Sequence, residues 1–73
     1  MNSEITGRLE GWWYDKANHV IWGYMYNDAR KRFSDGAYIH TSNLRLPKTT
    51  VFYEGMEVPT LNSTYLLGTP FEG

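Results

Sequence analysis

A chain of 73 residues without a single cysteine has few ways to become stable. Its length allows one domain, and folding at this size buries only about 60% of the surface that the unfolded chain exposes. The lack of cysteine excludes disulfides and thiolate metal sites, and the two histidines, His19 and His40, do not make a tetrahedral metal site by themselves. We therefore expect one domain over residues 1–70 with a loose tail over 71–73, stabilised by dense packing or self-association.

The material for dense packing is aromatic. Three tryptophans, six tyrosines and three phenylalanines make up 16% of the chain, and such rings bury much area while losing few rotamers. With 41% apolar and 21% charged residues, the composition is that of a folded protein and not of a disordered tail. The sequence contains no run of 18 apolar residues, so it predicts no membrane span. The N-terminal residues lack the pattern of a signal peptide. These features predict a soluble protein of the cytoplasm.

Apolar and polar residues alternate along most of the chain, as they do in half-buried β-strands. In the first such stretch Leu9 and Trp13 fall on the apolar parity, together with glycines at 7 and 11. Turn residues separate the expected strands, which cover Glu4–Tyr14, His19–Tyr26, Ala37–Leu46, Thr49–Tyr53, Met56–Thr60 and Thr64–Leu67. The expected fold is all-β, a small antiparallel barrel or curled sheet of five to six short strands, of SH3-like or OB-like size.

Three features refine this expectation. The strand that contains Trp22 is apolar on both faces, so we expect it to be central or to meet a partner chain. Pro59 cannot donate to a ladder, which favours an edge position for its strand. Adjacent residues of a regular strand point to opposite faces, so at least one of Trp12 and Trp13 lies outside the main core. An exposed edge or an exposed tryptophan would favour a homo-oligomer.

The charge is unevenly distributed although the net charge is only −1. Residues 30–48 carry +4, whereas residues 1–29 carry −2 and residues 49–73 carry −3. This pattern fits an anion site in the middle of the chain, or ordinary surface charges on a solvated hairpin. Because proteins that bind duplex DNA are normally basic overall, we expect no binding to duplex DNA.

No catalytic motif is present. The chain has no cysteine nucleophile, G-x-S-x-G elbow, P-loop or H-E-x-x-H pair, and a barrel this small leaves little room for a closed cleft. We therefore expect a binding protein that is not an enzyme and that needs no cofactor.

Two polar segments are candidates for binding. Arg30 and Arg32 precede a Ser-Asp-Gly turn, and guanidinium groups and turn N–H groups both suit phosphate; the alternative is a solvated loop. A second run of polar residues interrupts the third expected strand and consists of His40, Thr41, Ser42 and Asn43. Such side chains are costly in an interior, so they indicate a wet groove or a ligand pocket, or else the outer face of an edge strand.

Three rings complete the candidate site. Trp12 and Trp22 are able to stack on a nucleobase, but more often such rings form the core or a subunit interface. Tyr65 either packs or reaches a ligand. The preceding Asn62 and Ser63 form a glycosylation sequon with Thr64, but in the absence of a secretion signal a turn is the better interpretation.

Five segments together cover most of the chain: Gly-Arg-Leu-Glu-Gly-Trp (7–12), Ile-Trp-Gly (21–23), Arg-Phe-Ser-Asp-Gly (32–36), Ile-His-Thr-Ser (39–42) and Leu-Asn-Ser-Thr-Tyr-Leu-Leu-Gly (61–68). In these segments the chain resembles small β-rich accessory proteins of tailed bacteriophages. The resemblance implies a protein that works in the cytoplasm of the host cell. It also implies a role by binding, either the block of a host enzyme or defence complex or the sequestration of a nucleotide signal.

The leading hypothesis is a homo-oligomeric module that captures an anionic nucleotide or cyclic-nucleotide signal. The residues expected to hold the ligand are Arg30, Arg32, His40, Thr41, Ser42, Asn43, Trp12, Trp22 and Tyr65. The alternative is an inhibitor that docks on a host protein through exposed tryptophans and an edge strand. The third is a protein that binds single-stranded nucleic acid, which the net charge disfavours.

Overall fold

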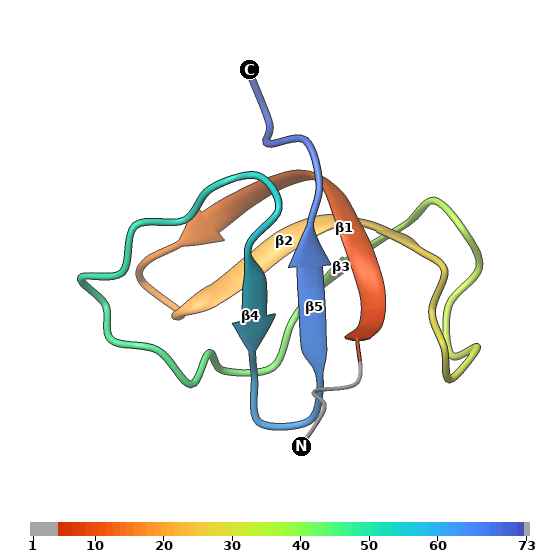
Figure 1. The fold of residues 1–73 in the computed structure, drawn as a ribbon, viewed down its shortest axis with the longest axis horizontal. Coiled ribbons are helices and arrows are strands. Elements are labelled where there is room, and N and C mark those ends of the chain that lie inside the picture. Colours follow the sequence, from red (N-terminus) through yellow and green to blue (C-terminus); the bar gives the residue numbers. More distant parts are fainter. Residues whose placement is uncertain (1–4, 73) are drawn as a thin grey trace.

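Five strands form one sheet in the computed structural model, which describes residues 5–72 (Figure 1). The strand order in the sheet is β3-β2-β1-β5-β4. The strands are β1 (Ile5–Asp15), β2 (Val20–Tyr26), β3 (Ala37–His40), β4 (Glu57–Pro59) and β5 (Thr64–Leu67). No helix occurs in this range, and the prediction of an all-β curled sheet of five to six strands is confirmed.

The sheet is mixed. β1, β2 and β3 form an antiparallel meander, and β4 pairs with β5 antiparallel, but β1 and β5 run parallel. A parallel pair requires a crossover, which the chain between β3 and β4 supplies (Figure 1). Alternation within a strand does not report the direction of its neighbour, so the sequence did not indicate this pairing. β2 lies between β1 and β3, as its two apolar faces predicted, and Pro59 lies in the edge strand β4.

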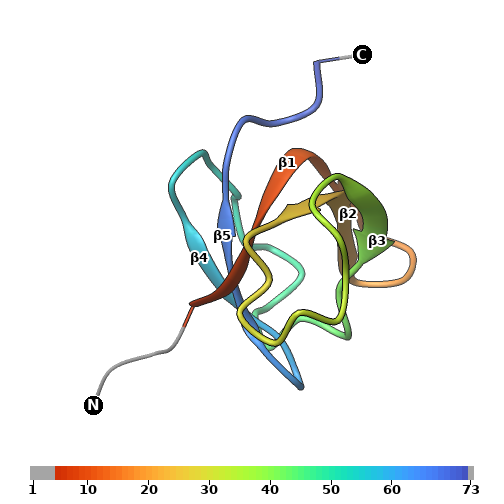
Figure 2. The ribbon, with the colours of Figure 1, turned by 90° about the vertical axis from the view of Figure 1, so that its right-hand side faces the viewer.

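The curl brings the two edges of the sheet together at one end. Leu44 and Thr60, which follow β3 and β4, form an isolated antiparallel bridge. The N–H of Arg45 donates to the carbonyl of Pro59 at 2.9 Å, and the N–H of Leu61 donates to that of Asn43 at 3.1 Å. Figure 2 shows β4 and β5 on one side and β2 and β3 on the other. The sheet is therefore curled and tied at one corner without being a closed barrel.

A bulge in β1 overturns the predicted placement of Trp13. Glu10 faces Tyr24 and Trp13 faces Trp22, so Gly11 and Trp12 share one opposing residue. Gly11 has φ of +59°, which is the left-handed conformation that glycine adopts in bulges of this kind. Because the bulge adds one residue to β1, the side chains after it point to the faces opposite to those that regular alternation predicts. Trp12 instead of Trp13 therefore joins the core. One of the two adjacent tryptophans does lie outside the core, as predicted: Trp12 is 6% exposed and Trp13 40%.

The core fills the inside of the curl. Leu9, Ile21, Met25, Val58 and Leu67 are fully inaccessible to solvent. Trp12, Leu44 and Tyr65 complete the cluster, with Phe52 and other partly buried side chains packed against it. Burial of a side chain such as Leu67 is worth roughly 1.5–3 kcal/mol.

Two predicted strands need correction. The strand expected over Ala37–Leu46 ends at His40. Beyond it the N–H of Thr41 still donates to the carbonyl of Ile21, but the Ser42 hydroxyl turns to Thr60. The stretch 49–53 is irregular. The apolar residue behind its alternation is Phe52, whose ring packs on that of Tyr14 with centroids 4.8 Å apart. No described strand pairs with this stretch.

The remaining boundaries agree with prediction to within one residue at most ends. β5 covers Thr64–Leu67 as predicted, and β2 starts one residue later than expected. The expected strand Met56–Thr60 is shortened to β4. Glu4, the first residue of the first expected strand, lies outside the described residues.

The segment after β5 follows the bulge in β1. The N–H of Gly11 donates to the carbonyl of Thr69 at 2.7 Å, and the N–H of Phe71 donates to that of Trp12 at 2.8 Å. The N–H of Thr69 donates to the Glu10 carboxylate, whose other oxygen accepts from Arg8 at 2.6 Å. These two donors hold the pKa of Glu10 below its usual value. The backbone is therefore tied as far as Phe71, within the stretch 71–73 expected to be loose.

Candidate functional site

A cluster of rings covers the outer face of β1, β2 and β3; it is called here the aromatic face and consists of Trp13, Trp22, Tyr24, Tyr38 and His40. Trp13 pairs with Trp22, and Trp22 with His40, across neighbouring strands. The rings of Trp13 and Trp22 are nearly parallel with centroids 6.2 Å apart, and Tyr38 lies 5.6 Å from Trp22. The cluster follows from the alternation in β2, which puts rings on the side opposite to the core.

Most of these rings remain accessible. Trp13, Tyr24 and Tyr38 are 40%, 46% and 48% exposed, and His40 is exposed as well. Trp22 is only partly accessible because Trp13 flanks it from β1 while Tyr38 and His40 flank it from β3. Trp22 therefore offers an incoming ring its edge and not an open face.

Polar groups hold two of the indoles in place. The Trp13 Nε1–H donates to the Tyr38 hydroxyl at 2.8 Å, and the Trp22 Nε1–H donates to Oδ2 of Asp15 at 3.1 Å. Asp15 also accepts from the side chain of Asn18 at 2.8 Å. The Asn18 amide and the Trp22 indole together hold the pKa of Asp15 below its usual value. The turn after β1 thus fixes one side of the aromatic face.

A cavity of about 470 Å³, the ring cavity, opens beside this face. It is lined by Trp22, His40, Thr41, Ser42 and Asn43, together with Asn18 and Val20. Five of the nine predicted site residues therefore meet here. They meet because the chain bends after His40 instead of continuing as a strand, which turns the polar run along the wall of a hollow.

Two of the polar side chains that line the ring cavity, His40 and Asn43, each offer a free acceptor. His40 Nδ1 lies 2.8 Å from the carbonyl oxygen of Thr41; because a carbonyl only accepts, Nδ1 carries the hydrogen, and Nε2 of the neutral ring is an acceptor. The Asn43 amide donates to the carbonyl of Asn18 at 3.2 Å, so its oxygen is the group left to accept. Thr41 is buried, and its hydroxyl accepts from the N–H of Ile21. No arginine or lysine lines this cavity.

A second cavity of about 490 Å³, the arginine cavity, lies across a narrow ridge. Among the described residues 5–72, those that line it include two charged ones, Arg30 and Arg45, and no acidic one. The ridge is one side chain wide: the Ser42 hydroxyl, on the wall of the ring cavity, donates to Thr60 Oγ1 at 2.9 Å and accepts from the N–H of Asn62. Thr60 and Asn62 line the arginine cavity, so the two hollows adjoin.

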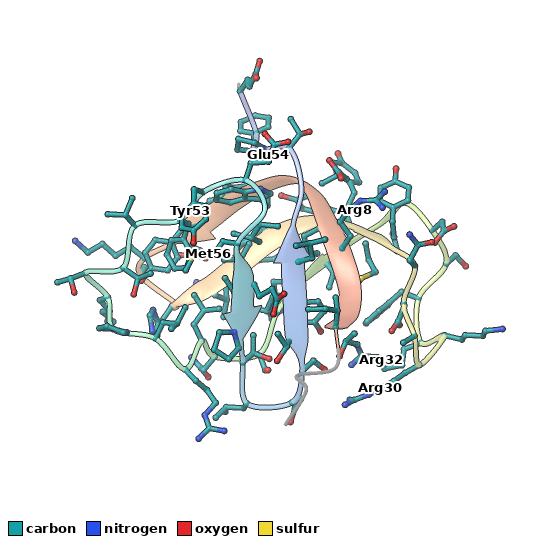
Figure 3. The ribbon with its side chains drawn as sticks, in the orientation of Figure 1. Arg8, Arg30, Arg32, Tyr53, Glu54 and Met56 are labelled. Atoms are coloured by element: carbon teal, nitrogen blue, oxygen red, sulfur yellow. The ribbon has the colours of Figure 1, made fainter. Side chains whose placement is uncertain are left out.

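Arg32 is placed differently from Arg30, although both lie at the same end of the molecule (Figure 3). Its backbone N–H and its Nε donate to Oδ2 of Asp28 at 2.8 and 3.4 Å, and its Nη2 donates to the Tyr65 hydroxyl at 3.2 Å. The side chain of Asp28 is only 1% exposed. Arg32 therefore pairs with the Asp28 carboxylate inside the protein, and it lines neither cavity.

Asp28 organises the whole basic loop over residues 27–36. Besides Arg32 it accepts from the N–H groups of Arg30 and Phe33, at 3.1 Å each. Burial would raise the pKa of Asp28, but the N–H groups of Arg30 and Arg32 and the Arg32 guanidinium outweigh it and hold the pKa below its usual value. The N–H groups that Asp28 binds precede the Ser-Asp-Gly turn that the sequence offered to an external phosphate, and within that turn the N–H of Gly36 donates to the carbonyl of Met25.

Two predicted ligand residues prove to be structural. Trp12 is in the core, and its Nε1–H donates to the carbonyl of Gly68 at 2.8 Å. Tyr65 is 4% exposed and reaches only Arg32 with its hydroxyl. Conversely, Asn18, Arg45 and Ser63 line the cavities without having been predicted. Arg45 belongs to the basic middle of the chain, which was a usable signal; nothing local to Asn18 or Ser63 marks them.

Within residues 5–72, no group of three or more histidine and carboxylate side chains is placed to hold a metal ion. The same range holds no helix with the length and apolarity that crossing a bilayer needs. Comparison of the chain with protein-family models, with curated proteins and with solved structures found no match.

Proposed function

We propose that this protein is a non-enzymatic binding module that captures a nucleotide or cyclic nucleotide, with the base held in the ring cavity. The observation that carries the proposal is the meeting of Trp22, His40 and Asn43 around one hollow of about 470 Å³. A pocket of this size, with an aromatic wall and a few polar groups, suits a small planar ligand.

The chemistry of the wall favours a base that carries amino groups. Nε2 of His40 and the amide oxygen of Asn43 are acceptors, and the exocyclic amines of adenine, guanine and cytosine are donors. Because Trp22 is flanked by neighbouring rings, the base would contact the edge of Trp22 and the exposed ring of His40. Stacking on a ring contributes about 1–3 kcal/mol per base.

The first test is binding of a nucleotide panel, followed by thermal unfolding and by amide chemical shifts. A ligand at 100 times its Kd stabilises the folded protein by about 2.7 kcal/mol, and the amides of His40 and Asn43 are expected to shift. The variants His40→Ala and Asn43→Ala remove one acceptor each from exposed positions, so each is expected to weaken binding about fivefold to tenfold without unfolding the protein.

The matched control is Tyr24→Ala, which removes an exposed ring of the same face that does not line the cavity. It is expected to leave nucleotide affinity within twofold. If no nucleotide or nucleoside stabilises the protein at millimolar concentration, or if Tyr24→Ala weakens binding as much as His40→Ala does, the base does not bind in the ring cavity and the proposal fails.

A second candidate function is favoured by the exposure of Trp13, Tyr24 and Tyr38 beside the edge strand β3. Tyrosine and tryptophan are enriched at protein interfaces, and an edge strand accepts another strand. The face would then dock on a host protein or on a second copy of the chain, in keeping with the resemblance to phage accessory proteins of the host cytoplasm. Trp13→Ser with Tyr38→Ser would abolish the complex or the oligomer, measured by sedimentation, whereas Asn43→Ala would not.

A further inference from the structure

The arginine cavity contains a buried hydroxyl without a partner. Ser63 is 8% exposed, and its Oγ is the one buried side-chain polar atom within residues 5–72 that makes no hydrogen bond. Ser63 lines the same cavity as Arg30 and Arg45. Buried hydroxyls normally find a partner, because leaving one unpaired forfeits its hydration without return. The described residues therefore supply no partner for the Ser63 hydroxyl, which is left over to donate.

The backbone of the neighbouring turn is already satisfied. The N–H of Thr60 donates to the carbonyl of Ser63, and the N–H of Ser63 donates to the Thr60 hydroxyl. The N–H groups of Leu61 and Asn62 donate to Asn43 and Ser42. The turn is thus rigid and offers no spare N–H group, so a ligand here must be held by side chains.

The side chains that remain are cationic or hydroxylic. The Arg30 guanidinium is anchored over the turn, since its Nη2 donates to the carbonyl of Asn62 at 3.1 Å, and within residues 5–72 no side chain or carbonyl accepts from its other N–H groups. The backbone of Arg45 is fixed, because its N–H donates to the carbonyl of Pro59. The part of the lining that the structure describes holds two guanidinium groups, the Ser63 hydroxyl and no carboxylate, so these described residues carry a net positive charge.

We infer that the arginine cavity is a phosphate subsite in which Arg30 and Arg45 neutralise the anion and the Ser63 hydroxyl donates to one of its oxygens. Guanidinium groups bind phosphate through paired N–H donors, and a phosphate has enough oxygens for three side chains. The inference rests on the proposed function, because the ring cavity adjoins this one across Ser42 and holds no cation for the charged end of a nucleotide. The same chemistry fits a phosphate of a free nucleotide and one of a nucleic-acid backbone.

The test follows the amide resonances of the full chain during titration with pyrophosphate, adenosine, ADP and a ten-residue thymidine oligonucleotide. Pyrophosphate is expected to shift Ser63 and Thr64, adenosine to shift His40 and Asn43, and ADP to shift both groups while binding more tightly than either fragment. Arg45→Met is expected to weaken pyrophosphate binding about tenfold, and Ser63→Ala about threefold to fivefold.

Lys31→Met is the control, because it removes an equal charge from the loop that also holds Arg30, at a residue that lines neither cavity. It is expected to change pyrophosphate affinity less than twofold. The inference is overturned if pyrophosphate and ADP leave Ser63 and Thr64 unshifted, or if Lys31→Met weakens binding as much as Arg45→Met does.

The fragments also separate this inference from the proposed function. If adenosine binds and pyrophosphate does not, the inference of a phosphate subsite is refuted while the binding of the base in the ring cavity is supported. If pyrophosphate binds while neither adenosine nor any nucleotide or nucleoside of the panel shifts His40 and Asn43, the subsite stands and the proposed function fails. Tighter binding of the oligonucleotide than of ADP, with a steep dependence on salt, would support the subsite and assign its phosphate to nucleic acid.

Discussion

Arg30 and Arg32 lie two residues apart in the same basic loop, yet the fold uses them in opposite ways. Arg32 is bound to the internal carboxylate of Asp28 and to the Tyr65 hydroxyl, so its charge is neutralised within the molecule. Arg30 donates to one backbone carbonyl and lines a cavity together with Arg45, where no residue of the described range 5–72 is acidic. A basic motif therefore does not reveal which of its cations is available; the position of the nearest buried anion decides this.

The variant Asp28→Asn tests this comparison with the largest expected effect on stability. The substitution replaces one carboxylate oxygen by an amide that cannot accept from the N–H groups of the loop, and the carboxylate is nearly inaccessible to solvent. We expect a loss of about 2–4 kcal/mol in the free energy of unfolding, measured by urea denaturation.

Asp35→Asn is the control for this change. Asp35 accepts from a single N–H, that of Asn27, at an exposed position, so its replacement is expected to cost less than about 1 kcal/mol. Equal losses in the two variants would show that Asp28 does not organise the loop.

Unfolding at low pH tests the role of the Asp28 carboxylate without a mutation. The carboxyls of Asp28 and Glu10 have pKa values below normal in the folded chain, so each contributes stability above its unfolded pKa of about 4 and loses it as pH falls through the folded pKa. Urea unfolding is expected to give a constant stability from pH 7 to 5 and a decline below about pH 4. The Asp28→Asn variant should decline less steeply, and an equal slope would remove Asp28 from the account.

The smallest effects come from the arginines themselves and separate their roles. Arg32→Met is expected to cost about 1 kcal/mol, because Asp28 loses a charged donor at a site that is partly screened by solvent. Arg30→Met is expected to change stability by less than about 0.5 kcal/mol while weakening pyrophosphate binding about tenfold. The reverse pattern, with Arg30 stabilising and Arg32 binding, would contradict the comparison.

Sequence reasoning was most successful where the signal was local. The strand Thr64–Leu67 was predicted at its observed bounds, and the two apolar faces of β2 correctly predicted a strand with neighbours on both sides. It failed where a regular strand was assumed to continue. The Gly11 bulge moved Trp12 into the core and Trp13 out of it, and a glycine in a strand is only a weak indicator of such a bulge.

The candidate site shows the same division. The polar run from His40 to Asn43 was identified from composition, and its residues do meet around one cavity with Trp22. The same reasoning assigned Arg32, Trp12 and Tyr65 to a ligand, although their partners lie inside the protein. It passed over Ser63 because a serine in a turn carries no mark of burial.

The order of amino acids was thus sufficient to specify an all-β chain, its turns and an apolar core, since alternation and turn chemistry act between near neighbours. The parallel pairing of β1 with β5, the bulge and the two adjoining cavities required the folded chain. Each of them depends on segments far apart in the sequence, such as Ser42 and Thr60 or Arg30 and Asn62, and the free energy of those contacts exists only once the sheet has curled.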